Sequence, residues 1–311
     1  MSTPEVTRPR RPRTWPQLEG ARRKPSEYEV VTHHVSYHFD RSPGPFDLDV
    51  STPVNRWYLR HREGSPLRVP DWNAFRDPRK LTYRGYVEQQ SRREAYLDSV
   101  VDRYESEAHR VALSPEWVAL LSRVYLTSRY SGHVLQMAAM YLASMAPSSY
   151  ITNCAEFQAA DEMRRIQRIA YRAASLGAEY DPALRDPGTA RRIWEDDPAW
   201  QPLRECLERL LVAYDWGEAF VALNLCVKPA HDAVLIDALA DAAAAAGDEE
   251  LALTLGDFGL DSDRSRQWSD ALAAFAVEAE PANAEPIDRW TAAWRPRAEA
   301  AVVPLRELLA A

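Results

Sequence analysis

The prolines are unevenly distributed along the chain, and their positions limit where long helices can form. Eleven of the 22 prolines lie between Pro4 and Pro78, within the first quarter of the 311 residues. Because proline lacks a backbone N–H and clashes with the preceding turn, this segment cannot form one regular helix. It also carries many large aromatic side chains, which are scarce in disordered tails. We therefore expect residues 1–80 to form an extended arm that packs in grooves on another surface.

One stretch of the arm has the composition of a strand. Residues 29–39 (EVVTHHVSYHF) are rich in β-branched and aromatic side chains, which are enriched in strands. We expect a single short strand there.

From about Arg79 onward the pattern becomes helical, and no segment alternates as a strand would. Ser114 followed by Pro115 is a favourable helix start. Prolines and glycines then separate the remaining helices. We expect helices over 82–110, 115–145, 149–177, 202–228, 230–246, 248–279 and 285–310, with a loop and a short helix over 178–201. Long helices joined by short loops predict an all-α helical bundle.

The composition indicates the cellular compartment of the protein and the class of its partners. The three cysteines, Cys154, Cys206 and Cys226, lie in apolar helical contexts without C-x-x-C spacing, which is typical of buried free thiols in a reducing cytoplasm. We find neither a secretory signal nor a run of about 18 apolar residues that would span a membrane. The net charge of −8 argues against a bulk nucleic-acid binder. Arginine and tryptophan are abundant, which fits either a protein interface or a compositional bias.

The motifs of several enzyme classes are missing from the sequence. It contains no G-x-G, no G-K-[ST] and no G-x-S-x-G. A di-iron bundle needs Glu-x-x-His on two helices, because this spacing places both ligands on one inward face. None of the seven histidines has a glutamate three residues earlier. We therefore expect no metal site and no catalytic site in this chain.

Three smaller patterns favour structural roles. Arg165 lies three residues after Glu162 and four after Asp161, so an ion pair with either is expected. Aspartates at one helix surface are expected to cap or stay solvated: Asp257, Asp261 and Asp263. Methionines at helical spacing are expected to pack in the core rather than in a partner groove: Met137, Met140, Met145 and Met163.

Residues 161–172 (DEMRRIQRIAYR), which follow 146–157 (APSSYITNCAEF), resemble a di-iron helix of the bacterial multicomponent monooxygenases. In the catalytic subunits of that family this segment reads Asp-Glu-x-Arg-His. Here Arg165 stands at the histidine position, and the upstream glutamate position lies near Gly132. Residues 260–268 (LDSDRSRQW) resemble the second such segment, with Arg264 at the glutamate position and Gln267 at the histidine position. The matching upstream stretch, 223–230, contains no carboxylate.

The chain is accordingly similar to the non-catalytic hydroxylase β subunits of toluene, phenol and propane monooxygenases. Further blocks carry the resemblance in the same order: 18–39, 75–90, 194–200 and 215–230. The chain ends soon after 290–301, earlier than some toluene-type members, which favours an alkane or phenol type.

The resemblance implies a ferritin-like helical domain over 81–311 without iron ligands. It implies packing against a di-iron α subunit in an (αβ)2 complex, with or without a γ subunit. An effector protein and an NADH-dependent reductase would complete a system that hydroxylates a hydrocarbon with O2. The arm, residues 1–80, would then pack on the partner subunit through aromatic anchors: Trp15, Tyr28, Trp57 and Trp72.

The residues alone are compatible with two other functions. An independent helical enzyme would need Glu162, His133 and His231 to converge. A scaffold or nucleic-acid adaptor would use the basic arm near Arg8, Arg10, Arg11 and Arg13, and its binding would depend strongly on salt.

Overall fold

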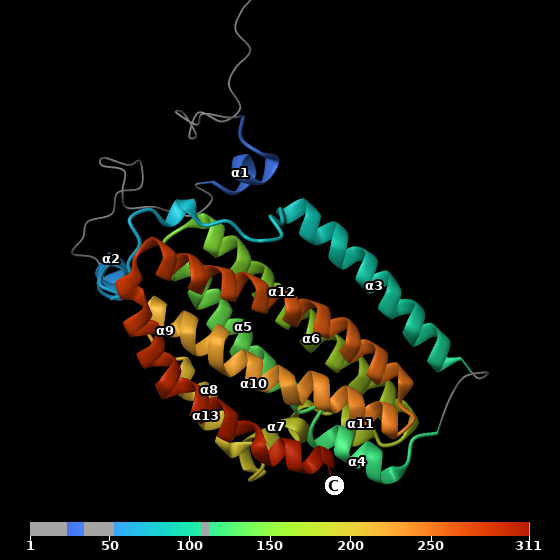
Figure 1. The fold of residues 1–311 in the computed structure, drawn as a ribbon. Coiled ribbons are helices and arrows are strands. Elements are labelled where there is room, and N and C mark those ends of the chain that lie inside the picture. The colour runs from blue at the N-terminus through green and yellow to red at the C-terminus, as the bar shows by residue number, and fades with distance from the viewer. Residues whose placement is uncertain (1–23, 34–52, 107–111, 311) are drawn as a thin grey trace, which may run out of the picture.

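The computed structural model describes residues 24–33, 53–106 and 112–310. All regular elements in these ranges are helical (Figure 1), which confirms the all-α prediction. The longer helices are α3 (Tyr83–Glu105), α4 (Pro115–Arg123), α5 (Ser128–Met145), α6 (Ser149–Glu179), α7 (Pro187–Asp196), α8 (Gln201–Leu210), α12 (Glu249–Ala279) and α13 (Ala284–Ala310). Short elements complete the set: α1 (Glu27–Thr32), α2 (Pro53–Tyr58), η2 (Leu59–Glu63), η3 (Trp72–Ala74), η4 (Pro182–Arg185) and η7 (Pro281–Asn283).

One long helix runs without a break from Trp216 to Ala245. It consists of α9 (Trp216–Phe220), the π-helical turns η5 (Val221–Val227), α10 (Lys228–Asp232), the π-helical turns η6 (Ala233–Ala238) and α11 (Leu239–Ala245). The expectation that Pro229 ends a helix is therefore wrong. The π turns before Pro229 widen the backbone, so the missing N–H and the ring are accommodated inside the helix.

This helix has the length and apolarity of a membrane span, with a mean hydropathy of 1.4 over its most apolar window. However, 78% of that window is buried inside the bundle. It is a core helix, and its apolar character reflects contact with helices on several sides.

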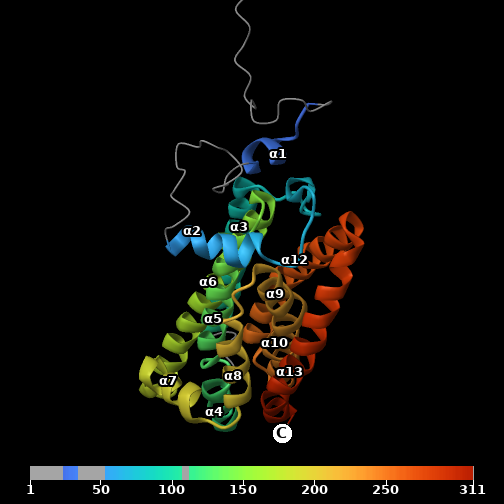
Figure 2. The same cartoon turned by 90° about the vertical axis from the view of Figure 1, so that its left-hand side faces the viewer.

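Four helices form the centre of the bundle. α5 and α6 pack as an antiparallel pair, and the Trp216–Ala245 helix packs with α12 in the same way (Figure 1). α3 lies alongside α12, while α8 and α13 cover the other side (Figures 1 and 2). The buried core is aromatic as well as aliphatic, and its largest fully buried side chains include Trp200, Trp216, Tyr125 and Tyr150.

The single helix expected over 115–145 is two helices, because the chain breaks at residues 124–127. No proline or glycine marks this break. Trp200 donates from its indole Nε1 to the Arg123 carbonyl at 2.8 Å, and Thr127 donates its hydroxyl to the Ser122 carbonyl at 2.9 Å. These side chains satisfy carbonyls that a continuous helix would bond internally.

The strand expected over 29–39 is also wrong in its described part, where α1 is a helix. Ser26 and Glu29 form a capping box: the Glu29 amide donates to Ser26 Oγ at 3.3 Å, and the Ser26 amide donates to Glu29 Oε2 at 2.9 Å. This local pairing stabilises the first helical turn against the strand propensity of the valines. Residues 34–39 lie outside the described residues.

Part of the described arm is hydrogen-bonded to the helical bundle of the same chain. Asp215 caps α9 and accepts the Ser65 hydroxyl at 2.8 Å. The side chain of Asn283 accepts from the Arg68 amide at 2.9 Å and donates to the Arg68 carbonyl at 2.7 Å. Residues 65–68 thus belong to the helical body, whereas the division at residue 80 stays a prediction.

Candidate functional site

Two reciprocal ion pairs join α6 and α12 in the interior of the bundle. Arg164 of α6 donates from Nη1 to Asp261 of α12 at 3.0 Å, and Arg264 of α12 pairs with Asp161 of α6. In each helix the aspartate lies three residues before the arginine, so α6 and α12 present the same Asp-x-x-Arg face to one another. All four side chains are buried.

Polar side chains of α3 complete this cluster. Tyr86 donates its hydroxyl to Asp161 Oδ1 at 2.9 Å. Gln90 donates from Nε2 to Asp161 at 3.0 Å and to Asp261 at 2.9 Å. Arg93 donates from Nε to Asp257 Oδ1 at 3.0 Å. The network therefore fastens α3 to both α6 and α12, and it shows that the expectation of a solvated surface is wrong for Asp257 and Asp261.

The two central aspartates differ in their protonation equilibria. Burial and the nearby negative charge of Asp261 raise the pKa of Asp161 to about 7, although Arg264 opposes the rise. Burial would also raise the pKa of Asp261, but Arg264 and Arg93 outweigh it, so this pKa lies below its usual value. Two buried carboxylates with different neighbours thus share one network.

A second buried cluster lies at the positions that the resemblance relates to metal ligands. The Lys228 ammonium lies 2.5 Å from Glu162 Oε1 and 2.9 Å from Asp232 Oδ2. The Nη1 atom of Arg165 lies 3.2 Å from both Glu162 Oε2 and Asp232 Oδ1. The pair expected between Arg165 and Glu162 is confirmed, whereas Asp161 pairs with Arg264 instead. Two cations therefore balance two carboxylates.

Two further polar side chains, His231 and Ser262, are hydrogen-bonded to this cluster. His231 contacts Asp232 Oδ1 through Nδ1 at 3.1 Å and Ser131 Oγ through Nε2 at 2.9 Å. Ser262 donates its hydroxyl to Asp232 Oδ2 at 2.7 Å. Burial would raise the pKa of Asp232, but Lys228 and Arg165 hold it well below its usual value. These partners keep Asp232 ionised.

The residues present do not fit a di-iron centre. Within the described ranges, no group of three or more His, Cys, Asp or Glu side chains is placed to hold a metal ion. At Gly132 an added Cβ would lie 4.0 Å from Glu162 Oε2, so the family's glutamate position does face this cluster. However, glycine supplies no ligand, and the Lys228 ammonium already occupies the space between the carboxylates.

The reciprocal ion pairs also correct the alignment of the second segment. They place Asp261 opposite Asp161 and Arg264 opposite Arg164, so Arg264 matches the arginine of Asp-Glu-x-Arg-His. Ser262 and Ser265 then stand at the glutamate and histidine positions, where Ser265 donates to Gln158 Oε1 at 2.7 Å. Gln267 instead lies on the surface and accepts from Arg79 Nε at 2.8 Å.

The three residues of a possible independent enzyme do not converge. His133 lies on the exposed side of α5, whereas His231 and Glu162 are buried and engaged with Ser131, Asp232 and Lys228. Hydrogen-bond reach between all three is therefore ruled out in this fold.

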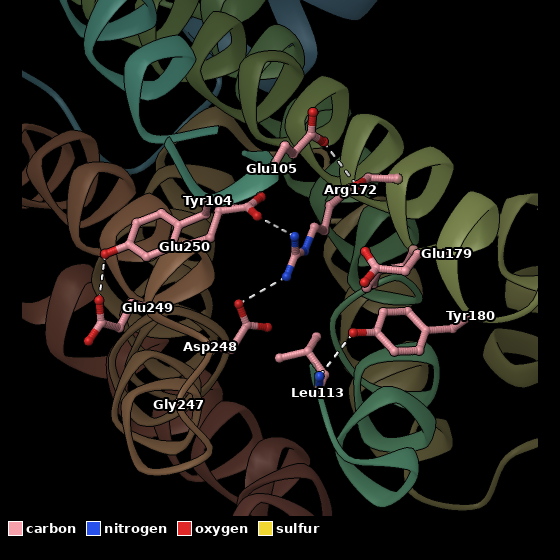
Figure 3. A pocket seen from close by; sticks show the side chains of 12 residues that line it. Tyr104, Glu105, Leu113, Arg172, Glu179, Tyr180, Gly247, Asp248, Glu249 and Glu250 are labelled. Carbon is pink, nitrogen blue, oxygen red and sulfur yellow. Dashed lines mark hydrogen bonds and ion pairs between the residues drawn. The ribbon is translucent and has the colours of Figure 1, made fainter. Parts of the chain in front are cut away.

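A small acidic pocket near the far end of α6 is an alternative site (Figure 3). Its cavity measures about 40 Å³. Arg172 enters it and pairs with Asp248 at 2.9 Å and with Glu250, while Tyr104 donates to Glu249 (Figure 3). The charges that line this pocket are largely paired within it, so it is better described as a structural ion-pair cluster.

The four aromatic anchors expected in the arm differ in their surroundings. Trp15 lies outside the described residues. Tyr28 is only 4% exposed and packs on Tyr150, with 5.5 Å between ring centroids. Trp72 packs edge-on against Trp216 at 4.9 Å. Only Trp57, which is 38% exposed, keeps a large free surface.

The methionine prediction is wrong for three of four side chains. Met145 is buried, but Met137, Met140 and Met163 are 36%, 41% and 40% exposed. The helical spacing was compatible with either face of the helix, and the outward face is the one observed.

Comparison with known proteins assigns the family. The family model for methane/phenol/alkene hydroxylases matches residues 57–280. The chain is 39% identical to the β subunit of the toluene-4-monooxygenase hydroxylase component of Ectopseudomonas mendocina, over 93% of this chain and 88% of that protein. It is 27% identical to the phenol 2-monooxygenase oxygenase component DmpL of Pseudomonas sp. (strain CF600), over 81% and 76% of the two chains.

Solved structures agree with this assignment. A chain of toluene 4-monooxygenase with toluene bound in its active site superposes with a TM-score of 0.90 at 36% identity, covering 98% of this chain and all of that one. Phenol hydroxylase from Pseudomonas sp. OX1 shares the fold, with a TM-score of 0.81 at 21% identity over 99% and 91% of the two chains. The chain therefore belongs to the methane/phenol/alkene hydroxylase family and is a hydroxylase β subunit of a multicomponent monooxygenase.

Proposed function

We propose that this chain is a non-catalytic subunit that supports a separate di-iron α subunit in the NADH- and O2-dependent hydroxylation of a hydrocarbon. The observation that carries the proposal is the Lys228 ammonium between Glu162 and Asp232. An ammonium at this position neutralises the carboxylates that a metal ion would otherwise need. Iron and substrate chemistry then belong to the partner.

The relatives support the assembly. They are named as subunits or components of hydroxylases, which fits a permanent complex such as (αβ)2, with or without a γ subunit. An effector protein would regulate the hydroxylase, and an NADH-dependent reductase would supply its electrons. We place the complex in the cytoplasm, because the three cysteines are free and buried: Cys154, Cys206 and Cys226.

The substrate we propose is an aromatic hydrocarbon of the toluene class. Identity is 39% to the toluene-4-monooxygenase subunit, against 27% to the phenol 2-monooxygenase component and 24% to the propane 2-monooxygenase small subunit of Gordonia sp. (strain TY-5). This order favours the toluene type over the alkane or phenol type expected from the position of the C-terminus.

The arm contains the residues that we propose to contact the α subunit. Trp57 is the described anchor with free surface, and Trp15 stays a prediction. Tyr28 and Trp72 contribute by fixing the arm to its own bundle. The alternative scaffold function, through Arg8, Arg10, Arg11 and Arg13, lies outside the described residues and finds no support among the relatives.

Metal analysis of the isolated chain and of the complex tests the proposal. The chain should be expressed alone and together with the α subunit of its own hydroxylase, and iron should be measured in each. We expect iron in proportion to the α subunit only, and toluene hydroxylation only from the complex with reductase, effector, NADH and O2. Stoichiometric iron in the isolated chain, or no association with the α subunit, would overturn the proposal.

A further inference from the structure

The outer face of the antiparallel α5–α6 pair lacks the charges that cover the rest of the molecule. On α5, the exposed residues follow the helical period at positions 133, 137, 140 and 144, and none is Asp, Glu, Lys or Arg. On α6, the exposed positions from 156 to 174 carry a single charged residue, Glu156. In a chain with 27% charged residues, so long a neutral stripe is a distinct surface.

Methionine, alanine and tyrosine make up most of this stripe. Met137 and Met140 project from α5, and Ala160, Met163 and Tyr171 project from α6. The two rows lie on neighbouring helices, since α5 and α6 pack directly against one another. Methionine adapts its shape to a partner, and alanine lets another helix approach closely.

The surface continues onto the arm. Trp57 donates from its indole to the Tyr141 hydroxyl of α5 at 3.1 Å, and its ring packs edge-on against Tyr214 at 4.9 Å. Val54 and Val212, on the same two segments as these rings, are exposed as well. Figure 2 shows α2, which carries Trp57, crossing the bundle near α5 and α6. The neutral stripe is thus continuous with the arm residue that the proposed function assigns to partner contact.

Other exposed helix faces have a different character. α13 exposes Asp288, Arg289, Arg295, Arg297 and Glu299, and α3 exposes charges of both signs along its length. Such faces are compatible with water, whereas a large neutral face is typical of permanent subunit interfaces, from which charged residues are depleted.

We propose that the outer face of α5 and α6, extended by Trp57 and Tyr214, is the surface on which the catalytic α subunit packs. The occupant is an uncharged helical surface of that subunit, because the stripe offers small and apolar side chains and almost no charge to pair with. This inference rests on the proposed function and specifies its interface.

Glu156 is the one exception to the neutral character of this surface. It is the one acidic residue of the stripe, and partial shielding from water by the neighbouring side chains raises its pKa above the usual value. Covering it with a neutral partner surface costs less when the carboxyl is protonated.

The test uses matched charge insertions in the chain co-expressed with its own tagged α subunit. Met140→Glu and Ala160→Glu place a carboxylate in the centre of the stripe. Val303→Glu on α13 is the control, because Val303 and Met140 are both 41% exposed. We expect the first two variants to reduce co-purification roughly tenfold or more, since an unpaired charge would be buried, and the control to equal the wild type. Thermal unfolding of each isolated variant checks the fold.

The possible outcomes distinguish a failure of the proposed interface from a failure of the proposed function. Loss in the Val303→Glu variant with retention in the other two would overturn the assignment of this face. A wild-type chain that never associates with the α subunit would instead overturn the proposed function. If size-exclusion chromatography shows a homodimer of the isolated wild type that Ala160→Glu dissociates, the occupant is a second copy of the chain, and the proposal fails.

Discussion

The Lys228 ammonium lies 2.5 Å from Glu162 Oε1 in the interior of the bundle, and Glu162 is fully buried. A buried ion pair of this kind stabilises little relative to apolar packing, but removing one partner leaves an uncompensated charge. The pair thus neutralises a carboxylate in the interior of the bundle, as the proposed non-catalytic role requires.

Lys228→Met should destabilise the chain strongly, because Glu162 and Asp232 would then face Arg165 alone. We expect a loss of about 3–5 kcal/mol in the free energy of unfolding, measured by urea denaturation. The double variant Lys228→Met/Glu162→Gln restores charge balance and should be more stable than the single variant. Lys80→Met, at an exposed lysine, is the control and should change stability by less than about 0.5 kcal/mol. Equal losses in the single and double variants would contradict this account.

The helical class and most helix positions could be predicted from the sequence, because proline, glycine and capping residues act locally. The break at residues 124–127 could not, since it depends on a hydrogen bond from Trp200, which is distant in the sequence. The helix at Glu27–Thr32 could have been found from Ser26 and Glu29, whose spacing is that of a capping box.

The candidate site, too, could be predicted only in part from the sequence. That Arg165 stands where the resemblance implies a histidine is readable from one segment, but the role of Lys228 is not, because its partners come from three-dimensional packing. The alignment of the second segment could have been read from the sequence, since Asp261 and Arg264 repeat the spacing of Asp161 and Arg164, and the reciprocal ion pairs agree with that register.

Stability should fall as pH rises from about 4 to 7 through the contribution of Asp161. Its pKa is raised in the folded chain to about 7, so the folded state binds more protons than the unfolded state in this range. The stabilisation is present below the unfolded pKa and is lost as pH rises through the folded one. Asp161→Asn should flatten this part of the profile. Urea midpoints of the wild type and the variant from pH 4.5 to 8 measure it, and parallel profiles would contradict the assignment.

Gly217→Ala should displace the arm segment at residues 65–67. An added Cβ would lie 2.9 Å from Leu67 Cβ, 3.0 Å from Ser65 Oγ and 3.1 Å from Trp290 Cη2. Overpacking of this kind costs about 1–3 kcal/mol, which should lower the thermal midpoint. Gly256→Ala is the matched control, because nothing lies within 4 Å of its added Cβ and alanine favours a helix by up to about 1 kcal/mol. A Gly217→Ala chain as stable as the Gly256→Ala chain would show that segment 65–67 is loosely held.

Glu156 should make association with the α subunit pH-dependent. Partial shielding from water already raises its pKa in the isolated chain, and a neutral partner surface would raise it further, so docking takes up a proton and tightens as pH falls. Glu156→Gln removes the titration, and this variant should bind at pH 8 about as tightly as the wild type binds at lower pH. Dissociation constants of both chains at pH 6 and pH 8 measure the effect. Tighter binding of the wild type at pH 8 would mean that Glu156 meets a cation of the partner, which would contradict the neutral surface proposed for it.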